Sequence, residues 1–357
     1  MPVPEPINVA IIGAGGIAAK LHLPQLEEIP GVQIKILAGR KRERLEVLSK
    51  RHGGRIVTDY RAAIEDPGVN AVVISTPHPQ HVAWGVLALQ AGKHVFMQKP
   101  LAPSIAEADR FVAAVEQSDR SVYCLPQLTT PAILMMQELL AEGKLGQLSG
   151  GHCRFSHGGP EVYNAGVREL LGEAPLKAGE KLWFFEAGEA AVGALFDMGV
   201  YAIARLVGVL GEARRVMGMT AILHKPSQVE DTASLLIQFA NGAITTAETG
   251  WCDGASTGRL MLHGTEGRVE MFGYSSNTIT LYQQASKTNE DLAPIRTEID
   301  CSKYPALNSH RQWVELIRAH AQPKLETAQA ARHITEIMLA GLESGRTGRV
   351  VELKTGL

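Results

Sequence analysis

The sequence predicts two domains: an α/β N-terminal domain built on a doubly wound parallel sheet, and an α+β C-terminal domain with an open, mainly antiparallel sheet. Continuous apolar runs alternate with helical patterns over the first 125 residues, as in strands buried on both faces. A glycine-rich turn joins the first run to the first helix. Beyond this region, strands with alternating polarity are separated by glycine turns. We therefore place the domains at residues 1–125 and 126–357.

The N-terminal elements follow one another in regular order. The predicted strands are the short apolar runs at 7–12, 32–38, 54–57, 70–76, 93–97 and 121–125. Helices are expected from about Gly16, over 42–52, over 81–92 and after Ser104, which forms a capping box with Glu107. Six strands with helical crossovers are typical of a doubly wound sheet.

The C-terminal elements have a different pattern. The predicted strands are 231–240, 243–251, 259–264, 267–273 and 278–284. Their turns contain Asn241-Gly242, Gly254 and Thr265-Glu266-Gly267, which favours hairpins. Helices are expected near 131–142, over 189–210 and over roughly 309–346.

Composition excludes several classes of protein. Hydrophobic residues make up 45% of the chain and charged residues 20%, and the formal charge of −2 gives no general attraction to nucleic acid or membranes. The four cysteines form no CxxC pair, which argues against a metal site and fits a reduced cytoplasm. We expect no signal peptide, because no basic segment precedes the first apolar run, and no membrane span.

The turn "GAGGIA" after the first strand has the spacing of a dinucleotide-binding loop. Gly13 permits the tight turn, Gly15 lets the backbone approach a pyrophosphate, and Ala18 is small enough for the helix to pack on the strand. Gly16 and Ile17 open the helix, whose N-terminus faces the phosphates. In this context the motif predicts a Rossmann domain that binds NAD(P), although a purely structural turn is the alternative.

The end of the second strand bears on the choice of cofactor. Gly39 stands where an NAD-binding domain usually has an acid, and Arg40 and Lys41 follow it. Glycine leaves room for a 2′-phosphate, and the two cations can neutralise it. This pattern favours NADP over NAD, although the same cations could simply begin a solvated, basic helix.

Two further segments follow strand ends, where ligands bind in such sheets. Ser75, Thr76 and Pro77 would border the nicotinamide half of the cofactor, with His81 able to reach it, unless "STPHPQH" is only a helix start. The fifth strand ends in Gln98-Lys99-Pro100, where proline fixes the backbone after the lysine. The Lys99 ammonium is therefore expected to enter the same crevice, with Gln98 beside it.

The helix around "GALFDMGVYAIARLVGVL" is apolar apart from three residues. Asp197, Tyr201 and Arg205 are spaced four apart, so they share one face. A carboxylate in such a helix is costly unless it has a partner. It is either part of a site or a buried acid paired with a neighbouring backbone or arginine.

Together these elements resemble the Gfo/Idh/MocA family of NAD(P)-dependent oxidoreductases over nearly the whole chain. The resemblance is carried by "GAGGIAAKLHLP", "DPGVNAVVISTPHPQH", "AGKHVFMQKPLA", "GALFDMGVY" and "VEDTASLLIQFANGA". The family's Glu-Lys-Pro signature is Gln98-Lys99-Pro100 here, so the glutamate is lost. Tyr201 stands where many members have a histidine. A tyrosine at this position resembles the branch that contains glucose–fructose oxidoreductase, xylose dehydrogenase and dihydrodiol dehydrogenase. Ala204, where the histidine branch commonly has an acid, favours the same branch.

The resemblance implies a catalytic set. Tyr201 would be the acid–base, Lys99 its electrostatic partner, because a nearby ammonium favours tyrosinate, and Asp197 would orient substrate or lysine. Gln127, after the sixth strand, is expected to border both cofactor and substrate. Trp183 in "WFFE" would offer an aromatic face to a sugar, unless these aromatics are core. The glycine-rich segment 155–164 is expected to be a loop beside the site.

The expected function is hydride transfer between NADP, or NAD, and a secondary alcohol or carbonyl of a sugar, glycoside or cyclic diol. Two alternatives remain: a glycosidase or lyase that oxidises its sugar only transiently, and a non-catalytic NADP-binding regulator. We also expect a homodimer or homotetramer, because helices can cover only one face of the C-terminal sheet. Leu235 and Ile237, or their alternates along the strand, would then need a partner chain.

Overall fold

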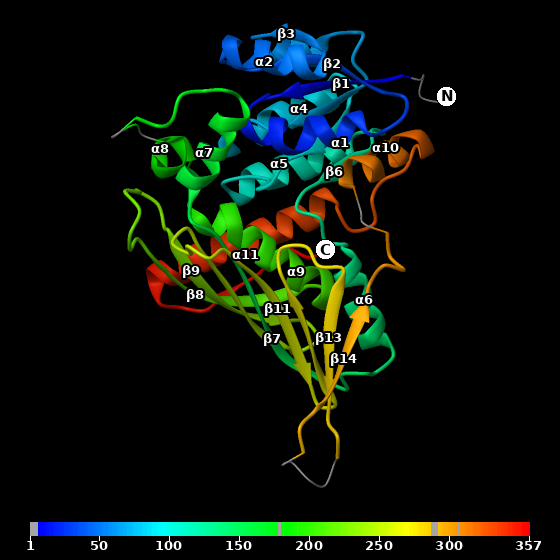
Figure 1. Cartoon of the computed structure of the whole chain (residues 1–357), viewed down its shortest axis with the longest axis vertical. Helices are drawn as coiled ribbons and strands as arrows, with labels where there is room; N and C mark the ends of the chain where they lie inside the picture. The colour runs from blue at the N-terminus through cyan, green and yellow to red at the C-terminus, as the bar shows by residue number, and fades with distance from the viewer. Residues whose placement is uncertain (1–5, 178–179, 181, 191, 287–291, 306–307) are drawn as a thin grey trace. The chain divides into compact units, whose positions relative to one another are not determined.

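The computed structural model describes the chain except residues 1–5, 178–179, 181, 191, 287–291 and 306–307 (Figure 1). The chain forms two compact units. The first comprises Met1–Pro126, Pro160–Ala191 and Asn308–Thr335, and the second Gln127–Gly159, Val192–Leu307 and Glu336–Leu357. The first unit therefore includes the segments Pro160–Ala191 and Asn308–Thr335, which the predicted division at residue 125 assigns to the C-terminal domain.

The first unit is built on a six-stranded parallel sheet in the order β3-β2-β1-β4-β5-β6. Its strands are β1 (Ile7–Ile12), β2 (Val32–Ala38), β3 (Arg55–Val57), β4 (Ala71–Ile74), β5 (His94–Met97) and β6 (Val122–Cys124). The order reverses between β1 and β4, which is the doubly wound arrangement that the sequence predicts.

Helices cover both faces of this sheet because successive strand residues point to opposite faces. Alternate strand residues such as Ile12 and Val72 pack with Phe111 of one helical layer, whereas Ile11 and Val73 belong to the opposite core. The helical elements are η1 (Ala18–His22), α1 (Leu23–Glu27), α2 (Arg42–His52), α3 (Tyr60–Glu65), η2 (His78–Gln80), α4 (His81–Gln90), α5 (Ile105–Glu116), α7 (Pro160–Leu170), η3 (Trp183–Phe185), α8 (Ala187–Ala190) and α10 (Ser309–Ala319), with the start of α11 (Ala328–Thr347). The predicted cap of α5 is present, since Ser104 accepts a hydrogen bond from the Glu107 N–H at 3.3 Å.

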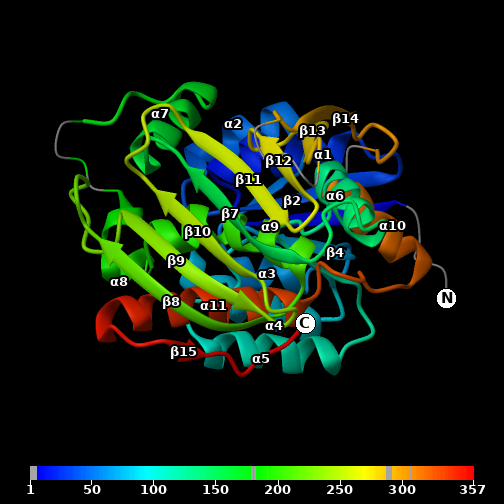
Figure 2. The ribbon, with the colours of Figure 1, turned by 90° about the horizontal axis from the view of Figure 1, so that it is seen from below.

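The second unit contains a nine-stranded sheet in the order β14-β13-β12-β11-β7-β10-β9-β8-β15. Its strands are β7 (Leu148–Ser156), β8 (Ala213–Ala221), β9 (Thr232–Phe239), β10 (Ile244–Gly250), β11 (Thr257–Gly264), β12 (Gly267–Phe272), β13 (Thr278–Gln283), β14 (Ile295–Asp300) and β15 (Val351–Glu352). Every pairing is antiparallel except that of β7 with β10, so the sheet is mixed but mainly antiparallel (Figure 2).

One face of this sheet is covered by helices. They are α6 (Pro131–Ala141), η4 (Leu195–Gly199), α9 (Val200–Leu210) and the second half of α11. Leu235 and Ile237 lie under this layer, and a Cβ on Gly341 of α11 would come within 2.5 Å of the Leu235 side chain. Their alternates form the other face, where Leu236 is 46% exposed and Met219 75% exposed.

Two predicted segments differ in the structure. The predicted loop at 155–164 is the end of β7 followed by α7, which begins at Pro160. The predicted helix at 189–210 is interrupted: α8 ends at Ala190 and a π-helical turn, η4, precedes α9. β7 itself is absent from the predicted strands because Gly150 and Gly151 break its apolar alternation.

Candidate functional site

The glycine turn after β1 has the geometry of a backbone cradle. Gly13 has φ +91°, and a Cβ there would lie 2.6 Å from the Thr76 N atom. The Ser75 hydroxyl donates to the Gly13 carbonyl at 3.0 Å, which ties the turn to the end of β4. A Cβ on Gly15 would meet nothing closer than 3.7 Å, so this glycine leaves open space above the turn. These features fit the approach of a pyrophosphate.

Gly16 and Ile17 continue from this turn into η1. A Cβ on Gly16 would lie 2.9 Å from Val167 of α7, so packing within the unit already requires a glycine there. Ile17 is half-buried and caps η1 with helical backbone angles. Packing against α7 therefore explains why residue 16 is a glycine. Gly13 and Gly15 are still best explained by the approach of a cofactor.

The end of β2 presents the predicted cations to solvent. Gly39 is buried, and a Cβ there would lie 2.9 Å from the Leu45 side chain. Arg40 and Lys41 are exposed, and neither forms a salt bridge within the described part of the chain. No acidic side chain occupies the end of this strand, so the structure offers two solvated cations where a 2′-phosphate would bind.

The segment after β4 is held by a buried histidine. Pro77 is half-buried, whereas Ser75 and Thr76 are buried. The His81 ring is fully buried, with Nε2 at 2.7 Å from the Thr76 carbonyl oxygen and Nδ1 at 2.7 Å from that of Pro100. Burial lowers the pKa of His81. Because both ring nitrogens contact backbone, this geometry does not support direct contact between His81 and the cofactor; the ring braces the two loops instead.

Lys99 follows the last residue of β5, at the carboxyl edge of the parallel sheet, and is half-buried. The Gln98 N–H donates to the Ile74 carbonyl at 3.1 Å, which holds this segment beside β4. The Gln98 side-chain oxygen accepts from the backbone N–H of Lys99 at 2.7 Å. The backbone that presents the lysine is therefore fixed by the Gln98 amide, at the position where the family that the sequence resembles has a glutamate.

Trp183 belongs to an aromatic cluster of the first unit. Its ring centroid lies 3.9 Å from that of Phe184 and 5.1 Å from that of His78, which directly follows the Ser75–Pro77 segment. Trp183 and Phe184 are half-buried, whereas Phe185 is buried. Phe185 is thus a core residue, and Trp183 retains an accessible surface beside the predicted cofactor loop.

Asp197 lies in η4 of the second unit, close to two side chains from neighbouring segments. The Trp251 indole N–H donates to its Oδ2 atom at 3.0 Å, and His157 Nε2 lies 3.6 Å from the same oxygen. The Asp197 side chain is 14% exposed. The Trp251 indole and the His157 imidazole therefore lie beside this carboxylate; His157 falls in the segment 155–164 that the sequence placed beside the site, whereas Trp251 was not predicted there. The position of Trp251, just after β10, could have been inferred only from the pairing of that strand with β7.

A half-buried carboxylate, that of Glu230, fixes the start of η4. Oε1 of Glu230 accepts hydrogen bonds from the backbone N–H groups of Gly193 and Leu195 at 3.1 and 3.2 Å. Burial raises the pKa of this carboxyl. Two N–H groups that have no partner within the helix are thereby satisfied, and the turn carrying Asp197 is anchored.

Tyr201 and Arg205 lie one turn apart on α9 and both approach Phe155 of β7. The Tyr201 ring centroid is 6.1 Å from that of Phe155, and the Arg205 guanidinium lies 5.9 Å from the same ring. Arg205 is buried and donates to the Gln127 carbonyl at 2.9 Å. Burial lowers the pKa of Arg205, although a guanidinium remains charged at neutral pH. The second unit thus brings Gln127, Asp197 and Tyr201 onto one helix-and-strand framework.

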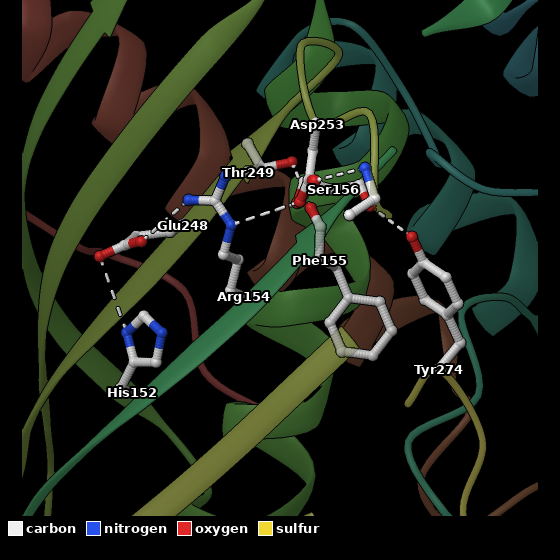
Figure 3. Close-up of polar contacts among 9 residues, drawn as sticks. His152, Arg154, Phe155, Ser156, Glu248, Thr249, Asp253 and Tyr274 are labelled. Atoms are coloured by element: carbon white, nitrogen blue, oxygen red, sulfur yellow. Dashed lines mark hydrogen bonds and ion pairs between the residues drawn. The ribbon is translucent and has the colours of Figure 1, made fainter. Parts of the chain in front are cut away.

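A polar network holds the end of β7 (Figure 3). Arg154 lies 3.1 Å from Glu248 and 3.8 Å from Asp253, and the Ser156 hydroxyl donates to Asp253 at 2.5 Å. This hydrogen bond is the first cause of the lowered pKa of Asp253. The Tyr274 hydroxyl donates to the Ser156 carbonyl. The network fixes the backbone on either side of Phe155.

Two other kinds of site have no support in the described residues. No group of histidine, cysteine, aspartate and glutamate side chains there could hold a metal ion. Within the same residues, every helix is too short or too polar to cross a membrane.

Comparison with known proteins assigns the chain to a family. Residues 7–124 match the model "Oxidoreductase family, NAD-binding Rossmann fold", and residues 133–270 match the GFO/IDH/MocA C-terminal domain.

Individual relatives agree with this match. The chain is 27% identical over 322 residues to dTDP-3,4-didehydro-2,6-dideoxy-alpha-D-glucose 3-reductase of Actinomadura kijaniata, covering 90% of this chain and 88% of that protein. It is 27% identical over 240 residues to trans-1,2-dihydrobenzene-1,2-diol dehydrogenase of Oryctolagus cuniculus, covering 66% and 65%. The crystal structure of GenD2 from gentamicin A biosynthesis, in complex with NAD, is 25% identical with a TM-score of 0.78 and covers 99% of this chain and 97% of that chain. This protein therefore belongs to the Gfo/Idh/MocA family of oxidoreductases, with an NAD(P)-binding Rossmann domain.

Proposed function

We propose that this oxidoreductase transfers hydride between NADP and a secondary alcohol or carbonyl of a sugar, glycoside or cyclic diol. The observation that supports this most is the arrangement of Asp197 and Tyr201. The two residues span the junction of η4 and α9, and the carboxylate is held by Trp251 and His157. The names of the deoxysugar reductase and the dihydrodiol dehydrogenase support this class of substrate.

The proposed roles follow from the chemistry of alcohol oxidation. When bound, the nicotinamide supplies the hydride chemistry. Tyr201 takes the proton from the substrate hydroxyl during oxidation and returns it during reduction. Lys99 provides a positive charge that favours the ionised phenol and the developing alkoxide. Asp197 orients the substrate or the lysine, and Gln127 and Trp183 contribute to the walls of the cofactor and substrate site.

The preference for NADP rests on the end of β2. The exposed cations Arg40 and Lys41 and the absence of an acid at Gly39 support binding of a 2′-phosphate. Related structures include one with NAD and one described as NADPH-dependent, so both cofactors occur among similar proteins. The cysteines, which form no disulfide in the described part of the chain, support a reducing compartment, the cytoplasm.

The decisive experiment is a panel of sugars, glycosides and cyclic diols, assayed with NADP and with NAD by absorbance of the reduced nicotinamide. The proposal expects stoichiometric accumulation of NADPH with at least one substrate. Product formation without net NADPH would identify transient oxidation followed by elimination. Tight binding of NADP without turnover of any substrate would identify a non-catalytic regulator.

A further inference from the structure

Gln98 connects the proposed lysine to a pair of buried histidines. On one side its amide oxygen accepts from the Lys99 N–H at 2.7 Å. On the other side its Nε2 atom lies 3.3 Å from Nε2 of His22. His22 Nδ1 is 2.8 Å from Nε2 of His310, and His310 Nδ1 is 2.7 Å from the side-chain oxygen of Gln25. All these residues belong to the first unit.

The backbone fixes the direction of every hydrogen bond in this chain. The Lys99 N–H can only donate, so the group facing it must be the oxygen of the Gln98 amide. The amide nitrogen therefore faces His22 and donates to Nε2, which cannot carry a proton. The proton of His22 must then sit on Nδ1, where it is donated to Nε2 of His310.

The same logic sets the second histidine. Nε2 of His310 accepts from His22, so its own proton sits on Nδ1 and is donated to Gln25. Both imidazoles are thus neutral and protonated at Nδ1. A second proton on either ring would place two hydrogens between one pair of nitrogen atoms.

The surroundings reinforce the neutral state. Both histidine side chains are fully buried, and burial lowers the pKa of His22 to about 3 and that of His310 well below its ordinary value. Phe96 stacks on His310 with ring centroids 4.2 Å apart and meets the edge of His22 at 5.8 Å. The ring of Tyr123 is also stacked on Phe96, with centroids 5.4 Å apart. Burial lowers the pKa of His22, and burial together with the neighbouring His22 lowers that of His310; no other charged side chain contributes to either shift.

We propose that Gln98 is a positioning residue for Lys99 and that its amide selects the Nδ1–H tautomer of both His22 and His310. A glutamate at this position could only accept hydrogen bonds. His22 Nε2 would then have to carry a proton, either as an imidazolium or through reversal of both tautomers. The amide thus matches the neutral histidine pair, and it holds the lysine backbone without placing a carboxylate behind it. The link to catalysis rests on the proposed role of Lys99.

The first test uses the wild-type protein with 15N-labelled histidine. For His22 and His310 we expect signals of a protonated Nδ1 atom and an unprotonated Nε2 atom, both unchanged between pH 5 and 9. The variant His310→Gln assigns the signals, because it loses that of His310 and keeps that of His22. A protonated Nε2 on His22, or titration of either ring in this range, would overturn the proposal without any variant of Gln98.

The second test compares Gln98→Glu with Gln33→Glu, the same change at an exposed residue of β2. In Gln98→Glu we expect the His22 Nε2 signal to move to the protonated region, and the pH profile of kcat to gain one ionisation that the wild type lacks. Gln33→Glu should change neither. An unchanged His22 signal in folded Gln98→Glu protein contradicts the tautomer assignment, and an unchanged profile contradicts the link to Lys99.

A third variant measures the positioning itself. Gln98→Met removes both hydrogen bonds while keeping a similar volume. We expect the Lys99 backbone amide to exchange with solvent at least tenfold faster and kcat to fall about tenfold, with NADP affinity changed by less than about threefold. Because amide exchange needs no substrate, it tests the positioning role of Gln98 even if the proposed function is wrong. A Lys99 amide as protected as in the wild type would contradict it.

Discussion

Tyr201 and Lys99 are the side chains whose replacement tests the proposed chemistry most directly. Tyr201→Phe keeps the ring near Phe155 and removes only the hydroxyl. Turnover should fall by roughly 10²–10⁴, the usual effect of losing a general acid–base, while NADP still binds. Lys99→Ala should lose most turnover, and Lys99→Arg should recover little because a guanidinium cannot replace a compact ammonium. Steady-state kinetics and cofactor titration measure both effects.

The double variant provides the internal control. If the two residues act as one unit, Tyr201→Phe combined with Lys99→Ala should lose little more than the worse single variant. Near-normal turnover of Tyr201→Phe would instead assign the proton transfer to Lys99.

Asp197→Asn should reduce turnover only mildly if the carboxylate only orients the substrate, since the amide oxygen can still accept from Trp251.

Replacing Arg40 tests the proposed preference for NADP. Arg40→Ala should weaken NADP by roughly ten- to a hundredfold and NAD far less, because a charge-assisted hydrogen bond contributes about 1.5–3 kcal/mol and only NADP has the 2′-phosphate. Dissociation constants of both cofactors, measured by fluorescence or calorimetry, check this. Equal weakening of both would mean that the arginine is structural, and a wild type that prefers NAD would refute the cofactor proposal.

At the scale of elements, the start of η4 depends on Glu230. Glu230→Ala should lower the free energy of unfolding by about 1–3 kcal/mol, because the N–H groups of Gly193 and Leu195 lose their acceptor. Turnover should fall as well, since η4 carries Asp197. Glu230→Gln keeps an acceptor oxygen and should cost less. Chemical denaturation of both variants, with exposed Glu28→Ala as the control, tests the role of the cap.

Elements with a dense apolar pattern were predictable from the sequence, and elements without one were not. β1, β2 and α2 lie at the predicted residues because their buried positions form unbroken or periodic patterns. β7 could not be predicted, since its glycines hide the strand and its parallel partner β10 lies far along the chain. The Gln98–His22–His310 chain was equally hidden, because it joins residues 288 positions apart.

The whole molecule should lose stability in mild acid. Burial lowers the pKa of His22 to about 3 and of His94 to about 4, and also lowers those of His81 and His310. The unfolded chain binds protons at these histidines below about pH 6.5, whereas the folded chain does not, so stability falls as the pH drops from 6.5 toward these values. His22 and His94, whose folded-state pKa values lie at about 3 and about 4, each contribute a loss of about 2 kcal/mol between pH 7.5 and 5. Urea midpoints at the two pH values measure it; equal midpoints would contradict the buried neutral state.

The open sheet face of the second unit predicts self-association. Met217, Met219, Leu236 and Ile244 are exposed large apolar residues on neighbouring strands β8, β9 and β10. We propose that this face joins copies of the chain in a homodimer or homotetramer. Leu236→Glu should shift sedimentation toward the monomer, whereas Val47→Glu, at an exposed valine of α2, should not. A monomeric wild type at micromolar concentration would refute the proposal.

The division of the first unit between distant parts of the chain has a consequence for synthesis. His22 obtains its partner from His310, and the Cys124 N–H of β6 donates at 2.9 Å to the carbonyl of Glu326. A ribosome therefore releases the whole of the six-stranded sheet long before the segment that completes its core emerges. Until then β6 remains an edge with an unmet donor, and the aromatic layer around Phe96 lacks Trp313. Folding of the nucleotide-binding half therefore cannot be completed until residues 308–335 have emerged, even though its strands are made first.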